Sequence, residues 1–376
     1  MPAVTPAPSS GPGATGRTVQ RGAPGGNDTL DTTILLFLLQ DGVTSGAIYA
    51  LLGLGLVLVF AVTRVILIPQ GELVTYGALT YATLSAGRVP GTTYLVLLMG
   101  LVALVFDLVA ARRRLGTRVV LRVLAANAVP PLVILGLATL ATRGGPASEL
   151  VNFMLSLVIV APIGAYLYRI AYQPIAHASV LVLLIASVGV HLAMQGLGLL
   201  FFGAEGLRAP PVSRAAMSLG ALRITGQSLA VYGIALALIA GLWLFFGYTL
   251  YGKALRATAV NRLGARLVGI RTTLSGQIAF LLAATIGAVS GILIVPITTI
   301  YYDSGFLIGL KGFVAAIIGG LASYPVTALA ALLVGVVEAF SSFYASNYKE
   351  VIVFTLIIPV LLVRSLAQPA VDDDKE

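Results

Sequence analysis

Apolar runs of about twenty residues recur along most of this chain, and they constrain its fold more than any other feature. A bilayer core about 30 Å thick needs roughly 20 apolar residues per helix, and the chain supplies that length many times over. Only 10% of the 376 residues are charged, whereas soluble domains contain about 25%. Segments of alternating polarity, which a membrane β-barrel would need, are not present. The sequence therefore predicts an all-α, polytopic α-helical membrane protein.

The apolar runs define candidate membrane segments separated by short polar connections. Because several are short or rich in Gly and Pro, we expect about 8–11 membrane segments, some of them interrupted or re-entrant. The candidates are Ile34–Val62, Val65–Ser85, Tyr94–Ala110, Val119–Ala141, Val151–Ile170, Leu181–Phe202, Ala230–Thr249, Leu274–Ile300, Phe306–Leu321, Ala328–Phe343 and Val351–Val363.

Two of these segments are interrupted by polar residues. Pro69-Gln70-Gly71-Glu72 lies inside Val65–Ser85, and Lys311 lies inside Phe306–Leu321. Interrupted segments are tolerated at membrane depth only where protein buries them or where they line a cavity. In transporters they point to the substrate path, so we expect both segments to border such a path.

The polar parts of the chain give its domain organisation and its orientation. Residues 1–30 are rich in Pro, Gly, Ala, Ser and Thr and predict a disordered tail, residues 31–365 form the membrane domain, and residues 366–376 form a polar C-terminal tail. Basic residues mark cytoplasmic loops, and they gather in residues 251–271 and in a cluster of Arg112, Arg113, Arg114, Arg118 and Arg122. The connection 203–228 is one span away from residues 251–271, so we expect it on the external side.

The stretch 251–270 reads YGKALRATAVNRLGARLVGI and contains no acidic residue. Its basic residues are Lys253, Arg256, Arg262 and Arg266. Drawn as one helix, it places Val260, Leu263 and Leu267 along a single apolar stripe, with two of the arginines beside it. Two interpretations are open: a loop whose stripe rests on the membrane bundle, or a helix that docks into a groove on a soluble partner.

The residues that thiol chemistry, metal binding or nucleotide hydrolysis would need are absent or wrongly spaced. The chain has no cysteine, and its two histidines, His177 and His191, lack the spacing of a metal site on one helix. Gly247 to Lys253 has the G-x-x-x-x-G-K spacing of a phosphate-binding loop, but Ala254 follows where that motif needs Ser or Thr. We therefore expect no catalytic residue, no metal, no cofactor and no nucleic-acid binding, the net charge of +9 belonging to cytoplasmic loops.

A few polar side chains lie inside the apolar runs and are candidates for function. Glu72, Lys311 and Glu338 are ionisable, and a charge at membrane depth costs about 3 kcal/mol or more unless it faces a cavity or is paired. Glu72 and Lys311 either border a translocation path or pair internally, with each other, with Glu338 or with free carbonyls at helix breaks. Glu338 is itself a candidate for a structural ion pair. His191 and Gln195, at i and i+4, either line the path or form interhelical hydrogen bonds.

The basic stretch resembles the coupling loop of permease subunits of branched-chain amino acid type ABC importers. The family pattern G-x-A-x-R-A-x-A-x-N…A-x-x-x-G-I is present as Gly252, Ala254, Arg256, Ala257, Ala259, Asn261, Ala265, Gly269 and Ile270. Val260 stands where the family often has an acid. The resemblance implies that the stretch docks on a cytoplasmic ATPase through Arg256, Ala257, Asn261, Arg262, Leu263, Arg266, Leu267 and Gly269.

The resemblance extends over residues 30–364. DGVTSGAIYALLGLGLVLVF is similar to the opening helix of the family, and GLKGFVAAIIGGLASYPVTALAALLVGVVEAF is similar to its G-L-K-A-F segment. IPQGELVTYGAL is similar to the N-F-A-[HQ]-G-E-x-x-x-x-G-A segment, although Leu67, Ile68 and Pro69 replace Asn-Phe-Ala. Residues 91–150 exceed the family pattern and are expected to be an insertion.

The resemblance implies a multi-pass permease subunit of a bacterial inner-membrane importer for branched-chain or related amino acids. Its expected partners are a homologous second permease, two cytoplasmic ATPases that bind ATP and Mg²⁺, an extracytoplasmic substrate-binding protein and membrane lipid. The candidate translocation path is Gln70, Glu72, His191, Gln195 and Lys311. The alternative is a secondary transporter of small polar solutes that uses embedded carboxylates, which leaves the basic stretch without a role.

Overall fold

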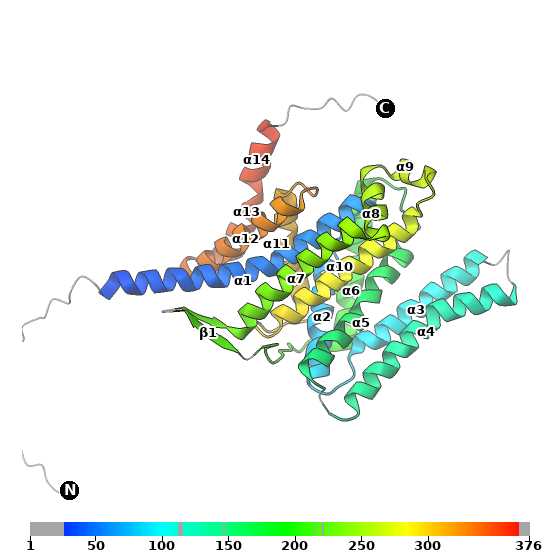
Figure 1. Ribbon diagram of the computed structural model, residues 1–376, viewed down its shortest axis with the longest axis horizontal. Coiled ribbons are helices and arrows are strands. Elements are labelled where there is room, and N and C mark those ends of the chain that lie inside the picture. The colour runs from blue at the N-terminus through cyan, green and yellow to red at the C-terminus, as the bar shows by residue number, and fades with distance from the viewer. Residues whose placement is uncertain (1–25, 112–115, 146, 214, 220–221, 368–376) are drawn as a thin grey trace, which may run out of the picture.

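The computed structural model describes residues 26–111, 116–145, 147–213, 215–219 and 222–367, nearly all of them helical (Figure 1). The elements are α1 (Gly26–Thr63), α2 (Gln70–Ser85), α3 (Gly91–Ala111), α4 (Thr117–Thr142), α5 (Glu149–Leu167) with the π-helical turn η2 (Tyr168–Tyr172), α6 (Val180–Phe202), β1 (Ala216–Leu219), β2 (Leu222–Thr225), α7 (Gly226–Tyr248), α8 (Leu250–Val260), α9 (Arg262–Leu267), α10 (Thr272–Ile294), α11 (Ser304–Ile318), α12 (Tyr324–Tyr344), the 3₁₀ turn η3 (Ser346–Tyr348), α13 (Lys349–Thr355) and α14 (Ile357–Ala367).

Every candidate segment from the sequence overlaps a helix, and Val351–Val363 is divided between two helices, α13 and α14. Within the described residues, nine helical stretches are long and apolar enough to cross a membrane. They are α1, α3 to α7, α10, α12 and residues 346–363. The two interrupted segments hold the short helices α2 and α11, of 16 and 15 residues. The prediction of an all-α polytopic membrane protein is confirmed, with one small antiparallel hairpin, β1–β2, that the apolar pattern does not predict.

Close helix packing through glycines forms the centre of the bundle. α1 and α12 run antiparallel, and a methyl group on Gly335 would lie 2.3 Å from the carbonyl oxygen of Gly42. Small residues allow membrane helices this close approach. α10 packs against α1, α2 and α5 and is largely buried. These four helices form the frame on which the polar residues are placed.

The two long polar connections lie at opposite ends of the bundle. Figure 1 shows β1 beside the start of α7, and α8 and α9 beyond its other end. α1 contacts β2 at one end of the molecule and α8 at the other. The connection 203–228 and the stretch 251–271 are therefore on opposite sides, as the sequence predicts.

The predicted tails need correction at their inner boundaries. α1 begins at Gly26, so residues 26–30 are helical rather than disordered, and α14 extends to Ala367. A helix adds a hydrogen bond for each residue it gains once it has nucleated, so it continues past the apolar run that predicts it. Residues 1–25 and 368–376 lie outside the described residues, as do Arg112 to Arg114 of the predicted cytoplasmic basic cluster.

Candidate functional site

The short helices α2 and α11 meet through their first turns. A methyl group on Gly71 would lie 2.0 Å from the carbonyl oxygen of Gly305, so only glycine fits at this contact. Gln70 fixes the depth of the junction, because its Nε2 donates a 3.0 Å hydrogen bond to the carbonyl of Ala283, halfway along α10. Helices that start in the middle of a membrane bundle commonly mark the substrate site of a transporter.

Glu72 of α2 is paired with His191 of α6 at this junction. Glu72 Oε1 and His191 Nδ1 are 2.7 Å apart, and the two residues are only 2% and 8% exposed. The ring of Phe306, from α11, lies 4.8 Å from the imidazole, centroid to centroid. Three helices that are distant in the chain therefore enclose one acid–imidazole pair.

Three oxygens near the junction lack a hydrogen-bond partner among the described residues. They are Gln70 Oε1, Glu72 Oε2 and Thr75 Oγ1. All three residues are at most 2% exposed, and a buried polar group without a partner costs about 1–3 kcal/mol. The junction thus has unused acceptor capacity, which suits a ligand that donates hydrogen bonds, such as an ammonium group.

Gln195 does not take part in this arrangement. It lies one turn after His191 on α6, is partly exposed, and makes no hydrogen bond to the described part of the chain. Its neighbour Met194 instead offers its carbonyl to the hydroxyl of Tyr76, at 2.6 Å. The structure therefore brings Gln70, Glu72 and His191 together and leaves Gln195 apart.

Lys311 lies in a separate charged cluster. Its ammonium group pairs with Glu338 of α12 and lies 3.3 Å from Glu350 Oε1 of α13. The hydroxyl of Tyr49, on α1, donates a 2.6 Å hydrogen bond to the other oxygen of Glu338. Lys311 and Glu72 therefore have different partners, and the alternative that pairs them with each other is wrong, because α11 directs Lys311 toward α12.

The basic stretch forms two short helices rather than one. Asn261 interrupts it with an extended backbone (φ −148°, ψ 103°) and caps α9, since its Oδ1 accepts a 2.8 Å hydrogen bond from the backbone of Gly264. Asparagine is among the strongest N-capping residues. The expectation of one continuous apolar stripe is wrong for this reason. Gly269 follows α9 in the left-handed region, with φ of 85°.

The apolar side chains of this stretch point away from the bundle, which contradicts the first sequence interpretation and is compatible with the second. Val260, Leu263 and Leu267 are 87%, 68% and 81% exposed, so they do not rest on the bundle. Arg262 donates a 3.0 Å hydrogen bond to the carbonyl of Ala176, and Arg266 Nε donates one of 3.0 Å to the hydroxyl of Thr272. These arginines tie the stretch to the bundle and leave its apolar side chains outward.

A hollow of about 650 Å³ lies between α8 and α9. It contains Arg256, Ala257 and Asn261 from the predicted coupling residues, with Lys253, Val260, Gly264, Ala265 and Val268. Arg256 is exposed and forms no hydrogen bond or ion pair with the described residues. The stretch thus presents a concave surface rimmed by exposed apolar and basic side chains, with no acid.

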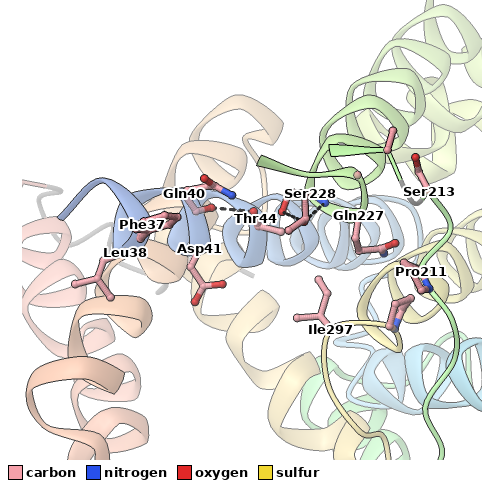
Figure 2. A pocket seen from close by; sticks show the side chains of 14 residues that line it. Phe37, Leu38, Gln40, Asp41, Thr44, Pro211, Ser213, Gln227, Ser228 and Ile297 are labelled. Atoms are coloured by element: carbon pink, nitrogen blue, oxygen red, sulfur yellow. Dashed lines mark hydrogen bonds between the residues drawn. The ribbon is translucent and has the colours of Figure 1, made fainter. Parts of the chain in front are cut away.

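Another pocket lies at the other end of the molecule and has a volume of about 860 Å³. Figure 2 shows Gln40 and Asp41 of α1 on one side and Gln227 and Ser228 of α7 on the other, with Pro211 of the connection beyond them. Asp41 is exposed there. No sequence pattern singles out these residues, because the pocket forms only when α1 and the 203–228 connection come together.

A polar cluster at the α3–α4 hairpin was also not predicted from the sequence. Asp107 of α3 forms an ion pair with Arg169 and accepts a 2.8 Å hydrogen bond from Asn127 of α4, whose Oδ1 accepts one of 3.0 Å from Arg169. The three residues fasten the hairpin to η2. Asp107 interrupts an apolar run just as Lys311 does, so the same sequence signal could have identified Asp107 as a candidate.

Comparison with known proteins agrees with these observations. The family model described as the permease component of branched-chain amino acid transport systems matches residues 38–361. The high-affinity branched-chain amino acid transport system permease protein LivH of Escherichia coli (strain K12) is 27% identical over 338 residues, which cover 88% of this chain and 94% of LivH. BraD of Pseudomonas aeruginosa, named in the same way, is 25% identical over 344 residues, covering 89% and 96%.

One solved structure also resembles the chain, PsaBC from Streptococcus pneumoniae in complex with Fab. It covers 89% of this chain and 94% of its own, with 10% sequence identity and a TM-score of 0.36. A similarity of that size is too weak to support a conclusion.

Proposed function

The chain belongs to the family of permease components of branched-chain amino acid transport systems, and we propose that it is a membrane subunit of an ATP-driven importer. It would reside in a bacterial inner membrane and pair with a homologous second permease. An extracytoplasmic binding protein would deliver the substrate, and two cytoplasmic ATPases would bind and hydrolyse ATP. The chain itself would perform no chemistry and bind no cofactor.

The observation that carries this proposal is the surface of the 251–271 stretch. Apolar side chains that are mostly exposed, next to a hollow with unpaired cations, suit a partner that buries them, because a few buried anchors carry most of the energy of an interface. The arginines that fasten α9 to the bundle would transmit its displacement to the turn between η2 and α6 and to α10. ATP binding would move the ATPases, and the stretch would pass that movement to the membrane helices.

The same proposal gives roles to the opposite end and to the middle of the bundle. The pocket at Gln40, Asp41 and Gln227 would be the mouth that receives substrate from the binding protein. The junction at Gln70, Glu72 and His191 would border the translocation path, with carboxylate and amide oxygens that suit the ammonium group of an amino acid. The names of the relatives favour branched-chain amino acids as the substrate.

The energy source distinguishes this proposal from an ion-driven transporter, for which the buried Glu72–His191 pair would be a proton carrier. The assembled complex is reconstituted in liposomes with ATP inside, and uptake is measured with and without an uncoupler. We expect uptake to require hydrolysable ATP and to continue when ion gradients collapse, because the ATPases drive the conformational change. Uptake that stops with the uncoupler while internal ATP remains would contradict the importer.

A further inference from the structure

A third cavity, distinct from the candidate path, opens at the side of the bundle near α8. It is a crevice of about 480 Å³ between α7 and α12, with α1 as its floor. Leu58 of α1 is buried at the floor, Phe246 of α7 and Tyr324 of α12 form the walls with their rings 6.3 Å apart, and Arg256 of α8 closes one end. Apart from Arg256, the lining is almost entirely apolar.

The outer face beside the crevice is suited to lipid. α7 exposes large apolar side chains along its length, including Leu236 at 67% and Trp243 at 67%. Trp243 lies 6.0 Å from the ring of Tyr248, which is 73% exposed at the end of the helix. Tryptophan and tyrosine gather at the boundary between membrane and water, so the Arg256 end of the crevice lies at headgroup level.

Size and charge both indicate the occupant. The crevice, at about 480 Å³, is an apolar space large enough for part of a phospholipid chain. The only charged residue in its lining, Arg256, has no partner among the described residues, and the whole stretch 251–271 contains no acid. Basic residues at the ends of membrane helices bind anionic headgroups.

We propose that this crevice binds one acyl chain of an anionic phospholipid and that Arg256 holds the phosphate of its headgroup. The lipid would link α7 and α12 next to the hollow between α8 and α9. The proposal concerns a site separate from the translocation path, and it does not depend on which solute the protein transports.

The test measures lipid bound to the purified complex by native mass spectrometry. The complex, in mild detergent, is equilibrated with phosphatidylglycerol or with phosphatidylcholine of the same chains. We expect about fivefold preferential retention of phosphatidylglycerol, the factor that one basic residue contributes near a membrane surface. Arg256→Ala should remove this preference, whereas Arg271→Ala, an exposed arginine of the same end outside the crevice, should leave it intact.

A second pair of variants tests the crevice itself. Gly247 lines the crevice, and no atom lies within 4 Å of the position that its side chain would take. Gly247→Phe should therefore fold and fill the cavity, lowering retention of both lipids. Gly241→Phe, at an equally open position of α7 outside the lining, is the matched control.

Two results would overturn the proposal. Equal retention of phosphatidylglycerol by the unmodified complex, Arg256→Ala and Gly247→Phe would mean that no lipid occupies the crevice. Loss of a partner subunit from Gly247→Phe with lipid retention unchanged would mean that a protein occupies it.

Discussion

Glu72 and His191 are 119 positions apart in the chain and meet with 2.7 Å between their side-chain atoms. An isolated charge at membrane depth costs about 3 kcal/mol or more, so each residue reduces the cost of placing the other. Both are recognisable as candidates because they interrupt apolar runs. Their pairing is not recognisable from the sequence, since it depends on the rotation of α6 about its axis. In the same orientation Gln195, one turn away, makes no hydrogen bond to the described residues.

The carboxylate of Glu72 is the group whose charge matters most at the junction. Glu72→Gln retains the shape of the side chain and a hydrogen-bond partner for His191 but removes the charge that would attract an ammonium group. We expect uptake by reconstituted complex to fall about tenfold, because hydrogen bonds to charged groups are stronger than neutral ones by about 1 kcal/mol or more.

Glu149→Gln is the matched control for this variant. Glu149 also accepts a hydrogen bond of 2.7 Å, from the hydroxyl of Tyr81, but lies at the start of α5 outside the junction. A complex that carries Glu149→Gln should transport substrate normally. Unchanged uptake by Glu72→Gln in a fully assembled complex would show that Glu72 has no role in the path.

At the scale of elements, α8 and α9 are the part of the structure that the sequence described least well. Composition and family pattern locate the stretch, and its role as a coupling loop stays a prediction. The helical period, however, applies only to an unbroken helix, and this helix is interrupted at Asn261, which caps α9. The break turns the apolar side chains outward while Arg262 and Arg266 reach the carbonyl of Ala176 and the hydroxyl of Thr272.

Leu263→Asp tests whether the exposed face of α9 docks on an ATPase. Leu263 is 68% exposed, so the variant should insert and fold normally. In a complex the new carboxylate would be desolvated, at a cost of several kcal/mol. We expect the variant to lose the ATPase subunits in a pull-down and to stop transporting.

Thr273→Asp supplies the control, because it places the same carboxylate on an exposed position of α10 at the same end of the molecule. It should retain the ATPases. Full retention by Leu263→Asp as well would mean that the face is not an interface. Arg262→Ala should also weaken retention, since it removes the contact that fixes α9 to the bundle.

At the scale of the whole molecule, charged side chains hold together helices that are remote in the chain. Lys311 connects α11 to α12 and α13, and Tyr49 adds α1 through Glu338. The Asp107–Arg169 pair does the same for the α3–α4 hairpin. In a bilayer the lipid is as apolar as the helix surfaces, so polar contacts and close packing determine which helices associate.

Lys311→Met leaves two carboxylates in this cluster without their cation. Removing one partner of a buried ion pair costs about 3–5 kcal/mol, so we expect a marked loss of assembled complex after extraction from the membrane and a lower midpoint of thermal unfolding. Lys349→Met is the control, since Lys349 is more exposed and lies 3.9 Å from Glu350. A stable Lys311→Met complex that fails to transport would instead place Lys311 on the path.

The sequence by itself determined the membrane class, the approximate positions of the apolar helices, the family, and most of the side chains that interrupt apolar runs, because these follow from local composition and short patterns. Only the tertiary structure decided that Glu72 pairs with His191 and Lys311 with Glu338 and Glu350, that residues of α1 and of the 203–228 connection share a pocket, and that the arginines after Asn261 face inward. The physical reason is the same in each case. Apolar length specifies that a helix forms in a bilayer, but the rotation and neighbours of that helix depend on contacts between residues that are distant in the chain.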